Sequence, residues 1–418
     1  MNKNAQLVII DGLRTPFSKM GTDLAALDAV EIGRQTVTAL LTRTGIDPAI
    51  IDEVILGNVA QPGDAANIAR VIALRSQIPR SVPAYTVHRN CASGLEALTT
   101  AAGKAAAGQG EIFLVGGVES MSHIPMLYHN NTTAKFSKLT RAKSLGQKLK
   151  AITAFRPRDF SPVVGLKIGL TDQVVGMNMG DTAEIIAREF KISRDEQDAF
   201  ALRSHEKATA ARERLAEEIV PTYSSSAKDG VAEMDNGVRE QQTMEALGKL
   251  RPVFERNTGT VTAGNSSQIT DGAGMMLVMS EAKASEHGLE PLGRLVDFHY
   301  SGCDPERMGL GPAHAMEAIA KRQGFNPDQA NVIEINEAFA AQVIGAKRLF
   351  ESMGVGSIPD ELLNPNGGAI ALGHPVGASG ARLVITALKE LQRRGGKRAY
   401  VSLCIGGGQG VAALLERL

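Results

Sequence analysis

Two segments of the sequence repeat in the same order, and this repetition limits the possible folds more than any other feature. Residues 45–58 (GIDPAIIDEVILGN) align without gaps with residues 324–337 (GFNPDQANVIEINE), at a constant offset of 279 residues. Residues 93–117 align in the same way with residues 379–403, at an offset of 286 residues. Any two βα units look alike, but two ungapped blocks in the same order favour a duplicated domain. The change in offset predicts a seven-residue insertion between the two blocks of the second half.

Short apolar runs and helical patterns alternate along the chain. The expected strands are residues 7–10, 53–58, 111–117, 332–336 and 399–408. The expected helices are residues 23–44, 92–107, 181–189, 194–217, 312–323 and 379–394. Because strand–helix alternation is typical of parallel sheets covered by helices, we predict an α/β fold with mostly parallel sheets. The length of 418 residues, with 43% hydrophobic residues, allows two or three domains with large cores.

Charge and cysteine content exclude several classes of protein. The 45 Lys and Arg residues balance the 45 Asp and Glu residues, so net charge gives no reason to expect a nucleic-acid partner. Three cysteines form no disulfide framework, and no Cys/His spacing indicates a metal site. No apolar stretch reaches the roughly 18 residues of a membrane span, and the first residues lead directly into a strand-like run. These features predict a cytoplasmic protein.

The segment between the repeats has a different character. We expect residues 121–250 to form a loop or lid domain inserted in the first half. Within it, residues 135–167 hold nine basic residues and one acid, Asp159. Apolar residues at helical spacing predict an amphipathic basic helix in this stretch. Those residues are Leu139, Ala142, Leu145 and Leu149.

Cys91 is the first candidate for chemistry. It follows a strand-like stretch and stands at the start of a helical pattern rich in Ala and Gly. The positive end of a helix dipole is worth up to about 2 kcal/mol, which corresponds to a thiol pKa lowered by roughly one unit. Full activation requires a further partner, such as a histidine. The alternative interpretation is that Cys91 is a small buried hydrophobic residue.

Three further segments place polar side chains at glycine-rich turns or strand ends. His374 lies in a glycine-rich turn before a helix, which would bring its imidazole to a surface that a ligand can approach. Cys404 ends a strand, and the turn after it, which includes Gly406, can present amides as an oxyanion hole. Asn336 ends another strand and offers a side-chain amide. From the internal repeat, we expect Cys91 and Cys404 on equivalent elements of the two halves, at one site.

Four short motifs follow one another in the chain. They are NCASG at 90–94, NEAFA at 336–340, GGAIALGHPVGASG at 367–380 and CIGGGQG at 404–410. In this order and spacing they resemble the thiolase family, the acetyl-CoA C-acyltransferases. VTAGNSSQITDGA (261–273) and MGDTAE (179–184) also match, so the resemblance covers essentially the whole chain.

The resemblance implies a thiolase fold, with two duplicated α/β halves in a layered αβαβα arrangement. The first half would span residues 1–120 and be completed by residues 251–283. Residues 121–250 would form the inserted loop domain, and residues 284–418 the second half. The resemblance also implies a homodimer or homotetramer.

The resemblance further implies catalytic roles. Cys91 would be the nucleophile that carries the acyl group, and His374 would activate it. Cys404 would act as acid and base at the substrate α-carbon or at the thiol of the leaving coenzyme A. One oxyanion hole would use His374 and a water held by Asn336, and the other would use the backbone amides of Cys91 and Gly406.

Coenzyme A is implied as a co-substrate, with no permanently bound cofactor. Ser267 matches a position that contacts the pantetheine arm, and Met179, in the MGDTAE motif, is a second expected contact. The basic stretch 135–167 has three open interpretations. The first is a solvated face, the second is a contact with the coenzyme A phosphates, and the third is a contact with a partner subunit or an anionic membrane surface.

Two enzymatic functions within the family stay open. The first is the cleavage of 3-ketoacyl-CoA by coenzyme A in fatty-acid β-oxidation, with a fatty-acid oxidation partner subunit. The second is the biosynthetic condensation of two acetyl-CoA molecules. Asn178 stands where the short-chain biosynthetic branch carries His, and Asn336 stands where the long-chain branch usually carries His. We expect the degradative reaction. A thiolase-fold carrier of acyl-CoA or lipid is the non-enzymatic alternative.

Overall fold

The computed structural model describes residues 6–418 and contains two compact units. The main unit comprises the chain up to His123 together with Asp172–Leu418. The inserted unit comprises Ile124–Thr171. The inserted unit is shorter than the predicted loop domain 121–250, because residues 172–250 pack within the main unit.

A ten-stranded sheet forms the framework of the main unit. Its order is β12-β13-β14-β11-β1-β10-β5-β3-β4, and β2 pairs with β10. The strands are β1 Leu7–Arg14, β2 Ser18–Lys19, β3 Glu53–Gly57, β4 Ala84–Val87, β5 Ile112–Glu119, β10 Thr270–Ser280, β11 Gly293–Gly302, β12 Val332–Ile335, β13 Arg398–Ile405 and β14 Gln409–Glu416. The prediction of mostly parallel sheets is wrong, because β1, β10, β11 and β14 all pair antiparallel with their neighbours. The short turn between β13 and β14 makes a hairpin that alternation of strands and helices does not reveal.

The two halves of the sheet repeat one pattern. From the middle outward, β1, β10, β5 and β3 correspond to β11, β14, β13 and β12. In each half one strand has parallel neighbours on both sides. On the outer side of β3, Val54 pairs with Ala84, and on the outer side of β12, Ile333 pairs with Leu363. Val54 and Ile333, and likewise Ala84 and Leu363, are 279 residues apart, as in the first repeated block. The offset of 286 residues begins at Ser379. The predicted insertion is therefore located in residues 364–378, the counterpart of residues 85–92.

Helices cover both faces of the strands. In the main unit they are α1 Ala29–Thr44, α2 Ile68–Arg75, α3 Ser93–Ala106, α7 Met179–Glu189, α8 Arg194–Ala210, α9 Arg212–Ala216, α10 Met244–Gly248, α11 Glu281–Glu286, α12 Gly311–Gln323, α13 Ala340–Ser352, α14 Ala369–Leu372 and α15 Ser379–Arg394. Helix α1 begins six residues later than predicted, since the Asp28 side chain caps it by accepting from the Glu31 amide. The predicted helix 194–217 is two helices that meet at Ala211.

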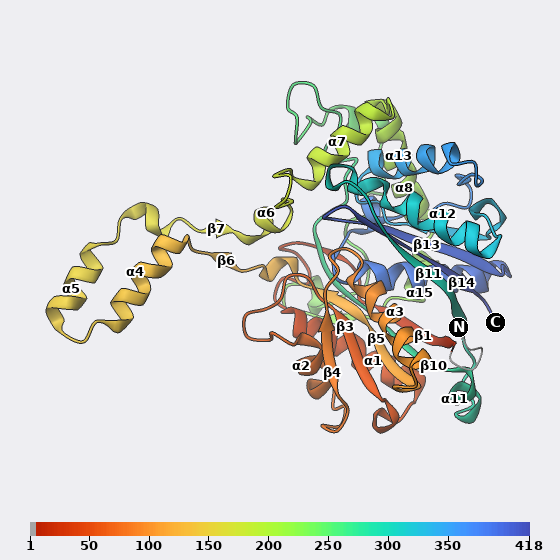
Figure 1. Cartoon of the computed structure of the whole chain (residues 1–418), viewed down its shortest axis with the longest axis horizontal. Coiled ribbons are helices and arrows are strands. Elements are labelled where there is room, and N and C mark those ends of the chain that lie inside the picture. Colours follow the sequence, from red (N-terminus) through yellow and green to blue (C-terminus); the bar gives the residue numbers. More distant parts are fainter. Residues whose placement is uncertain (1–5) are drawn as a thin grey trace. The chain divides into compact units, whose positions relative to one another are not determined.

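Helices α3 and α15 form the central layer. They share one apolar core with strands of both halves, for example with Val115 of β5 and Val401 of β13. A second core lies between the first-half strands and α1 and α2, and a third between the second-half strands and α12 and α13. The result is the predicted αβαβα layering. Figure 1 shows most of the first half in red and orange, its strand β10 in green to teal, and the second half from teal to blue. Strands covered on both faces explain the continuous apolar runs in the sequence.

The contact between α3 and α15 is reciprocal. A Cβ atom on Gly94 of α3 would lie 2.9 Å from the Ala381 amide nitrogen. A Cβ atom on Gly380 of α15 would lie 2.5 Å from the Leu95 amide nitrogen. Gly94 and Gly380 are equivalent in the repeat, and so are Leu95 and Ala381. The two helices therefore meet as two copies of one motif around a pseudo-twofold axis, where any side chain would separate them.

The inserted unit consists of a helical hairpin on a short ribbon. Its strands β6 (Met126–Leu127) and β7 (Val163–Val164) pair antiparallel, and its helices are α4 Asn130–Arg141, α5 Leu145–Thr153 and α6 Gly165–Gly169. Four aromatic rings pack in a row within it at centroid separations of 4.9–5.5 Å: Tyr128, Phe136, Phe155 and Phe160. The predicted single amphipathic helix is wrong, because Ser144 caps a new helix with Gln147 as its capping-box partner. In residues 6–418 no helix is long and apolar enough to cross a membrane.

Candidate active site

Cys91 lies at the end of a tight turn that leads into α3. Asn90 adopts a left-handed backbone conformation, with φ +44°. The Ser93 hydroxyl accepts from the Arg89 amide (2.9 Å) and donates to the Asn90 carbonyl (2.7 Å), which closes the turn. Cys91 is half-buried. A sharp turn before a helix presents a side chain at the helix N-terminus, as the sequence predicts.

The turn after β13 closes onto Cys91. The Asn90 side-chain amide donates to the Gly406 carbonyl (2.8 Å), and the Gly406 amide donates to the Cys91 sulfur. Burial raises the pKa of the Cys91 thiol, and hydrogen bonds from the Gly406 and Cys91 amides offset only part of that effect. The expected lowering of this pKa is therefore wrong for the isolated group, because desolvation outweighs the donors. A base has to remove the proton.

Cys404 is the second thiol of this region. It lies near the end of β13, is 1% exposed, and packs in an apolar cluster with Met308 and Phe339. Burial raises the pKa of Cys404 well above its usual value, and negative charge on Cys91 raises it further. The expected equivalence of the two cysteines is wrong: Cys91 precedes α3, whereas Cys404 lies in β13. The repeat pairs Cys404 with Val118, whereas Cys91 lies in residues 85–92, the counterpart of the segment 364–378 that holds the insertion.

Asn336 and His374 form a buried pair. Asn336 follows β12, and its backbone amide donates to the Ser402 carbonyl of β13 (2.9 Å), two residues before Cys404. The Asn336 Nδ2 lies 3.4 Å from His374 Nε2, and His374 Nδ1 lies 2.5 Å from the Ser379 hydroxyl. His374 is 8% exposed, so it is more deeply buried than its glycine-rich turn suggests. Burial, and to a lesser degree the charge of Arg382, lowers the pKa of His374 to about 4, so the imidazole is neutral at pH 7.

The structure brings one expected coenzyme A contact to the thiols and places the other beside Asn336. Met179 opens α7, and its sulfur lies 3.2 Å from the position that a Cβ atom on Gly406 would take. The Ser267 amide donates to the Ala338 carbonyl (2.9 Å), two residues after Asn336. Asn178 has a structural role here, since its side chain caps α7 by accepting from the Gly180 amide (3.2 Å).

Glu119 is a buried acid that sequence reasoning missed. It ends β5, and its carboxylate accepts from the amides of Val59 (3.1 Å), Ala60 (2.9 Å) and Gly377 (2.9 Å). Burial raises its pKa to about 7, and its charge raises the pKa of Cys91. Glu119 therefore connects the His374-bearing segment to the ends of β5 and β3. The sequence feature that indicates a buried acid here is the position of Glu119 directly after the apolar run IFLVGGV.

The site is free of metal-ligand clusters in the part of the chain that the structure describes, residues 6–418. Its chemistry-bearing groups come from both halves: Cys91 from the first, and Asn336, His374, Cys404 and Gly406 from the second. At neutral pH these thiols and this imidazole are uncharged. Such a site is suited to stabilising a negative charge that develops during a reaction.

Comparison with known proteins gives matches over nearly the whole chain. The thiolase N-terminal domain matches residues 7–282 and the thiolase C-terminal domain matches residues 289–417. The 3-ketoacyl-CoA thiolases of Yersinia enterocolitica and Yersinia pestis are 37% and 38% identical over 425 aligned positions, covering 98% of this chain and 97% of theirs. The crystal structure of the Bacillus anthracis acetyl-CoA acetyltransferase has a TM-score of 0.88 at 35% identity. The crystal structure of the human mitochondrial 3-ketoacyl-CoA thiolase in complex with CoA has a TM-score of 0.87 at 35% identity. Each of these two comparisons covers 99% of this chain and 99% of the other chain.

Proposed function

The chain belongs to the thiolase family of acyltransferases, and on that premise we propose that it cleaves 3-ketoacyl-CoA with coenzyme A to acetyl-CoA and a shortened acyl-CoA. The observation that carries this proposal is the pair of interacting thiols, the half-buried Cys91 with its Gly406 amide donor and the buried Cys404, together with the buried Asn336–His374 pair. The Yersinia relatives, named 3-ketoacyl-CoA thiolases, support the degradative direction. The Bacillus anthracis acetyl-CoA acetyltransferase supports the alternative, condensation of two acetyl-CoA molecules.

In the first half-reaction, Cys91 is the nucleophile. His374 accepts its proton, and the sulfur attacks the 3-keto carbon of the substrate. The bond between carbons 2 and 3 then breaks, which leaves the acyl group on Cys91 as a thioester and releases the enolate of acetyl-CoA. Cys404 donates its proton to carbon 2 of that enolate. A neutral buried thiol is suited to this step because it can give up a proton without carrying permanent charge.

In the second half-reaction, coenzyme A takes over the acyl group. Cys404, now a thiolate, accepts the proton of the coenzyme A thiol, whose sulfur attacks the thioester on Cys91. Cys91 leaves as thiolate and recovers its proton from His374. Exchange between two thiols is easy because attacking and leaving groups are chemically alike.

Two sets of donors stabilise the oxyanions in this proposal. The amides of Cys91 and Gly406 serve the oxygen of the tetrahedral intermediates on Cys91. His374 and a water held by Asn336 serve the enolate oxygen. The Asn336 Oδ1 makes no hydrogen bond to the described residues, so it is available to accept from that water. Each donor of this kind contributes about 3–4 kcal/mol to a transition state.

Thiolysis across chain length tests the proposed function. The purified protein is mixed with coenzyme A and 3-ketoacyl-CoA of four, eight or sixteen carbons, and loss of the 3-keto enolate absorbance is followed, with Cys91→Ser as control. Faster cleavage of the longer substrates supports fatty-acid degradation. Activity confined to the four-carbon substrate supports the short-chain alternative. If no substrate is cleaved, the acyl-CoA carrier becomes the better explanation.

We propose that the inserted unit binds an anionic membrane surface. Its α5 exposes an apolar face formed by Leu145 (76% exposed), Leu149 (56%) and Ile152 (53%). The nine basic residues of 135–167 accompany this face, and their one acid, Asp159, is paired with Lys135 at 2.5 Å. Exposed apolar side chains beside uncompensated positive charge favour an anionic lipid surface.

Vesicle binding at low salt tests this surface. We expect the protein to sediment with phosphatidylglycerol vesicles and not with phosphatidylcholine vesicles. The double substitution Lys148→Glu with Lys150→Glu should abolish binding. The same charge change in the main unit, Lys249→Glu with Lys397→Glu, should leave it intact. No binding to anionic vesicles would sink the membrane proposal and favour a partner subunit or the coenzyme A phosphates.

We also propose a homo-oligomer and a cytoplasmic location. The edge strand β4 is half-buried and pairs on one side with β3, which leaves its other side available to a second copy of the chain. Light scattering of the purified protein distinguishes a dimer or tetramer from a monomer. Association with a fatty-acid oxidation subunit is tested by copurification with the multifunctional protein of the same cell.

A further inference from the structure

We infer that Glu337 is a positioning residue for the thiolase reaction, one that fixes Asn336 and His374 relative to each other. This inference rests on the proposed roles of those two residues. It begins from the seven-residue insertion, which falls within residues 364–378. This segment contains α14 and His374, and the first half has no counterpart for its extra length. Contacts that are specific to the second half must therefore fix the position of this segment.

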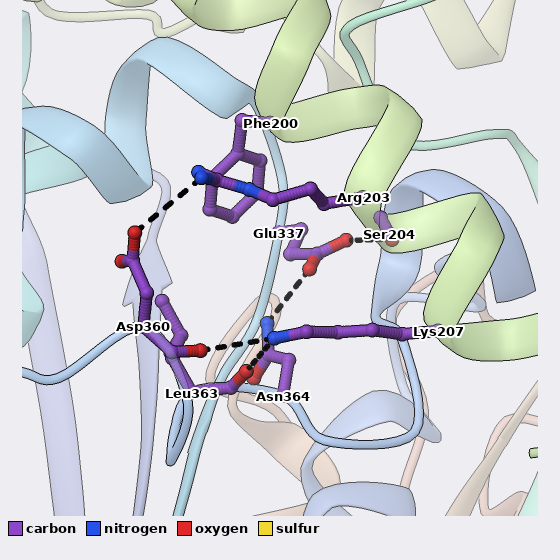
Figure 2. A pocket seen from close by; sticks show the side chains of 8 residues that line it. All are labelled: Phe200, Arg203, Ser204, Lys207, Glu337, Asp360, Leu363 and Asn364. Atoms are coloured by element: carbon purple, nitrogen blue, oxygen red, sulfur yellow. Dashed lines mark hydrogen bonds and ion pairs between the residues drawn. The ribbon is translucent and has the colours of Figure 1, made fainter. Parts of the chain in front are cut away.

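The Glu337 carboxylate contacts the first residue of this segment, Asn364. Glu337 follows Asn336 directly and is 1% exposed. Its carboxylate accepts from the Ser204 hydroxyl of α8 (2.6 Å), from the Asn364 side-chain amide (2.8 Å) and from the Ile370 backbone amide of α14 (3.2 Å). Figure 2 shows Ser204 and Asn364 converging on it from two different elements. One carboxylate thus connects α8, the start of the segment and α14.

Asn364 connects the same carboxylate to the strand that carries Asn336. Its side-chain oxygen accepts from the Ile335 amide, and its side-chain nitrogen donates to the Ile335 carbonyl, both at 2.9 Å. The Asn364 side chain therefore takes the place of a neighbouring strand at the end of β12. Its backbone has φ +44°, a left-handed conformation that turns the chain away from the strand into the segment.

The fit around the carboxylate leaves no room for adjustment. A Cβ atom on Gly367 would lie 2.5 Å from the Ser204 carbonyl, and one on Gly368 would overlap the Glu337 carboxyl group. The Gly368 amide also donates to the Ser204 hydroxyl (3.1 Å). The segment therefore lies directly against Glu337 and Ser204, and its path follows their positions.

The far end of the segment is held independently. The Gln268 side chain donates to the carbonyl of Ile370 (2.9 Å), and the Gln268 carbonyl accepts from the His374 amide (3.1 Å). Glu337 holds the amide of Ile370 and Gln268 holds its carbonyl. His374 follows α14 after a single glycine, so a displacement of α14 displaces the imidazole. Because Asn336 and Glu337 are consecutive, the same residue determines both partners of the 3.4 Å contact between Asn336 and His374.

The cavity beside this cluster does not give it another function. It measures about 20 Å³, room for about one water molecule, and is lined by Phe200, Arg203, Lys207, Asp360 and Leu363 besides the cluster itself. Lys207 donates to the carbonyls of Asp360 (3.0 Å) and Leu363 (2.7 Å), so its charge is already engaged there (Figure 2). No metabolite fits this space. The carboxylate acts on the segment rather than on a second ligand.

A double-mutant cycle with Asn336→Ala tests the inference. Glu337→Gln keeps the shape but directs an NH₂ group at donors that need an acceptor. With acetoacetyl-CoA and coenzyme A as substrates, we expect kcat to fall about 10- to 100-fold and KM for coenzyme A to stay within about threefold. In the Asn336→Ala background, the same substitution should cost less than about threefold, because the geometry it sets no longer serves a function. Asp360→Asn, at an exposed neighbour of the cluster, should leave kcat unchanged.

Two results would overturn the inference: equal losses of kcat in both backgrounds, or a Glu337→Gln variant that retains the kcat of the wild type. If Glu337→Gln does not fold, Ser204→Ala replaces it, with a smaller loss of kcat and the same lack of additivity expected. Thiolysis of acetoacetyl-CoA is the four-carbon case of the proposed cleavage and the reverse of the proposed condensation, so the same assay serves both proposed functions. Absence of activity in the wild type would contradict the proposed function instead.

Discussion

At the scale of single residues, the site depends on burial that keeps its groups neutral. Both thiols have raised pKa values and His374 has a lowered one, with desolvation as the largest cause in each case. Removing charge from the resting state means that the charge formed during reaction meets preorganised donors without competing ions. The two cysteines differ in access, since Cys91 is half-buried and Cys404 is buried, and this matches their different proposed roles.

Substitution of each cysteine separates these roles. Cys91→Ala should abolish acyl-enzyme formation, because it removes the thiol that we propose carries the acyl chain. Cys404→Ala should still be acylated by acetyl-CoA but turn over slowly, because it lacks the thiol that we propose moves the proton at the α-carbon and at the coenzyme A thiol. Mass spectrometry after incubation with acetyl-CoA detects the bound acetyl group. Full turnover by Cys91→Ala would disprove the mechanism.

The buried imidazole of His374 should make stability depend on pH. Its pKa is about 4 in the folded protein, compared with 6.5 for a histidine exposed to solvent. The unfolded chain therefore binds the proton first, and the folded state loses stability as the pH falls from about 6.5 towards 4. Between pH 7 and pH 4.5 this amounts to about 2–3 kcal/mol. Urea unfolding at the two pH values should show that loss relative to His374→Gln, and an identical pH dependence in the variant would refute it.

At the scale of elements, the α3–α15 contact is the joint between the two halves. Gly380→Ala places a methyl group against the backbone of α3 and should destabilise the fold by about 1–3 kcal/mol. Gly103→Ala is the matched control: it lies on α3 with open space around its Cβ position, and should stabilise the helix by up to about 1 kcal/mol. Chemical denaturation of both variants measures the difference. Equal stabilities would mean that the helices separate at little cost.

For two elements, the local sequence pattern predicts the wrong secondary structure or none. The helical spacing of Leu139 and Leu145 predicts one helix, but a cap at Ser144 interrupts it. Strand β14 was missed because its run, GVAALLE, contains residues common in helices. Its pairing with β13 and β11 decides its conformation, and that pairing depends on residues far away in the sequence.

At the scale of the whole molecule, the inserted unit is a separable part. The apolar core clusters among the described residues contain no residue of 124–171. A variant with residues 124–171 replaced by a Gly-Ser linker should therefore fold with a melting temperature within a few degrees of the full chain. Acetoacetyl-CoA thiolysis should persist and binding to anionic vesicles should be lost. A large increase in KM for coenzyme A would instead assign the basic stretch to the coenzyme A phosphates.

The sequence by itself determined the duplication, the α/β class and the family, and it predicted five chemistry-bearing positions, because these depend on local motifs and on their order. The tertiary structure alone decided the mixed direction of the sheet, the position of the insertion in 364–378, and the burial that shifts the pKa of His374. It also decided that Glu119 and Glu337 are buried acids with backbone and side-chain donors around them. Desolvation and hydrogen bonding depend on what surrounds a residue in space. The groups that surround these acids come from segments up to about 260 residues away in the chain.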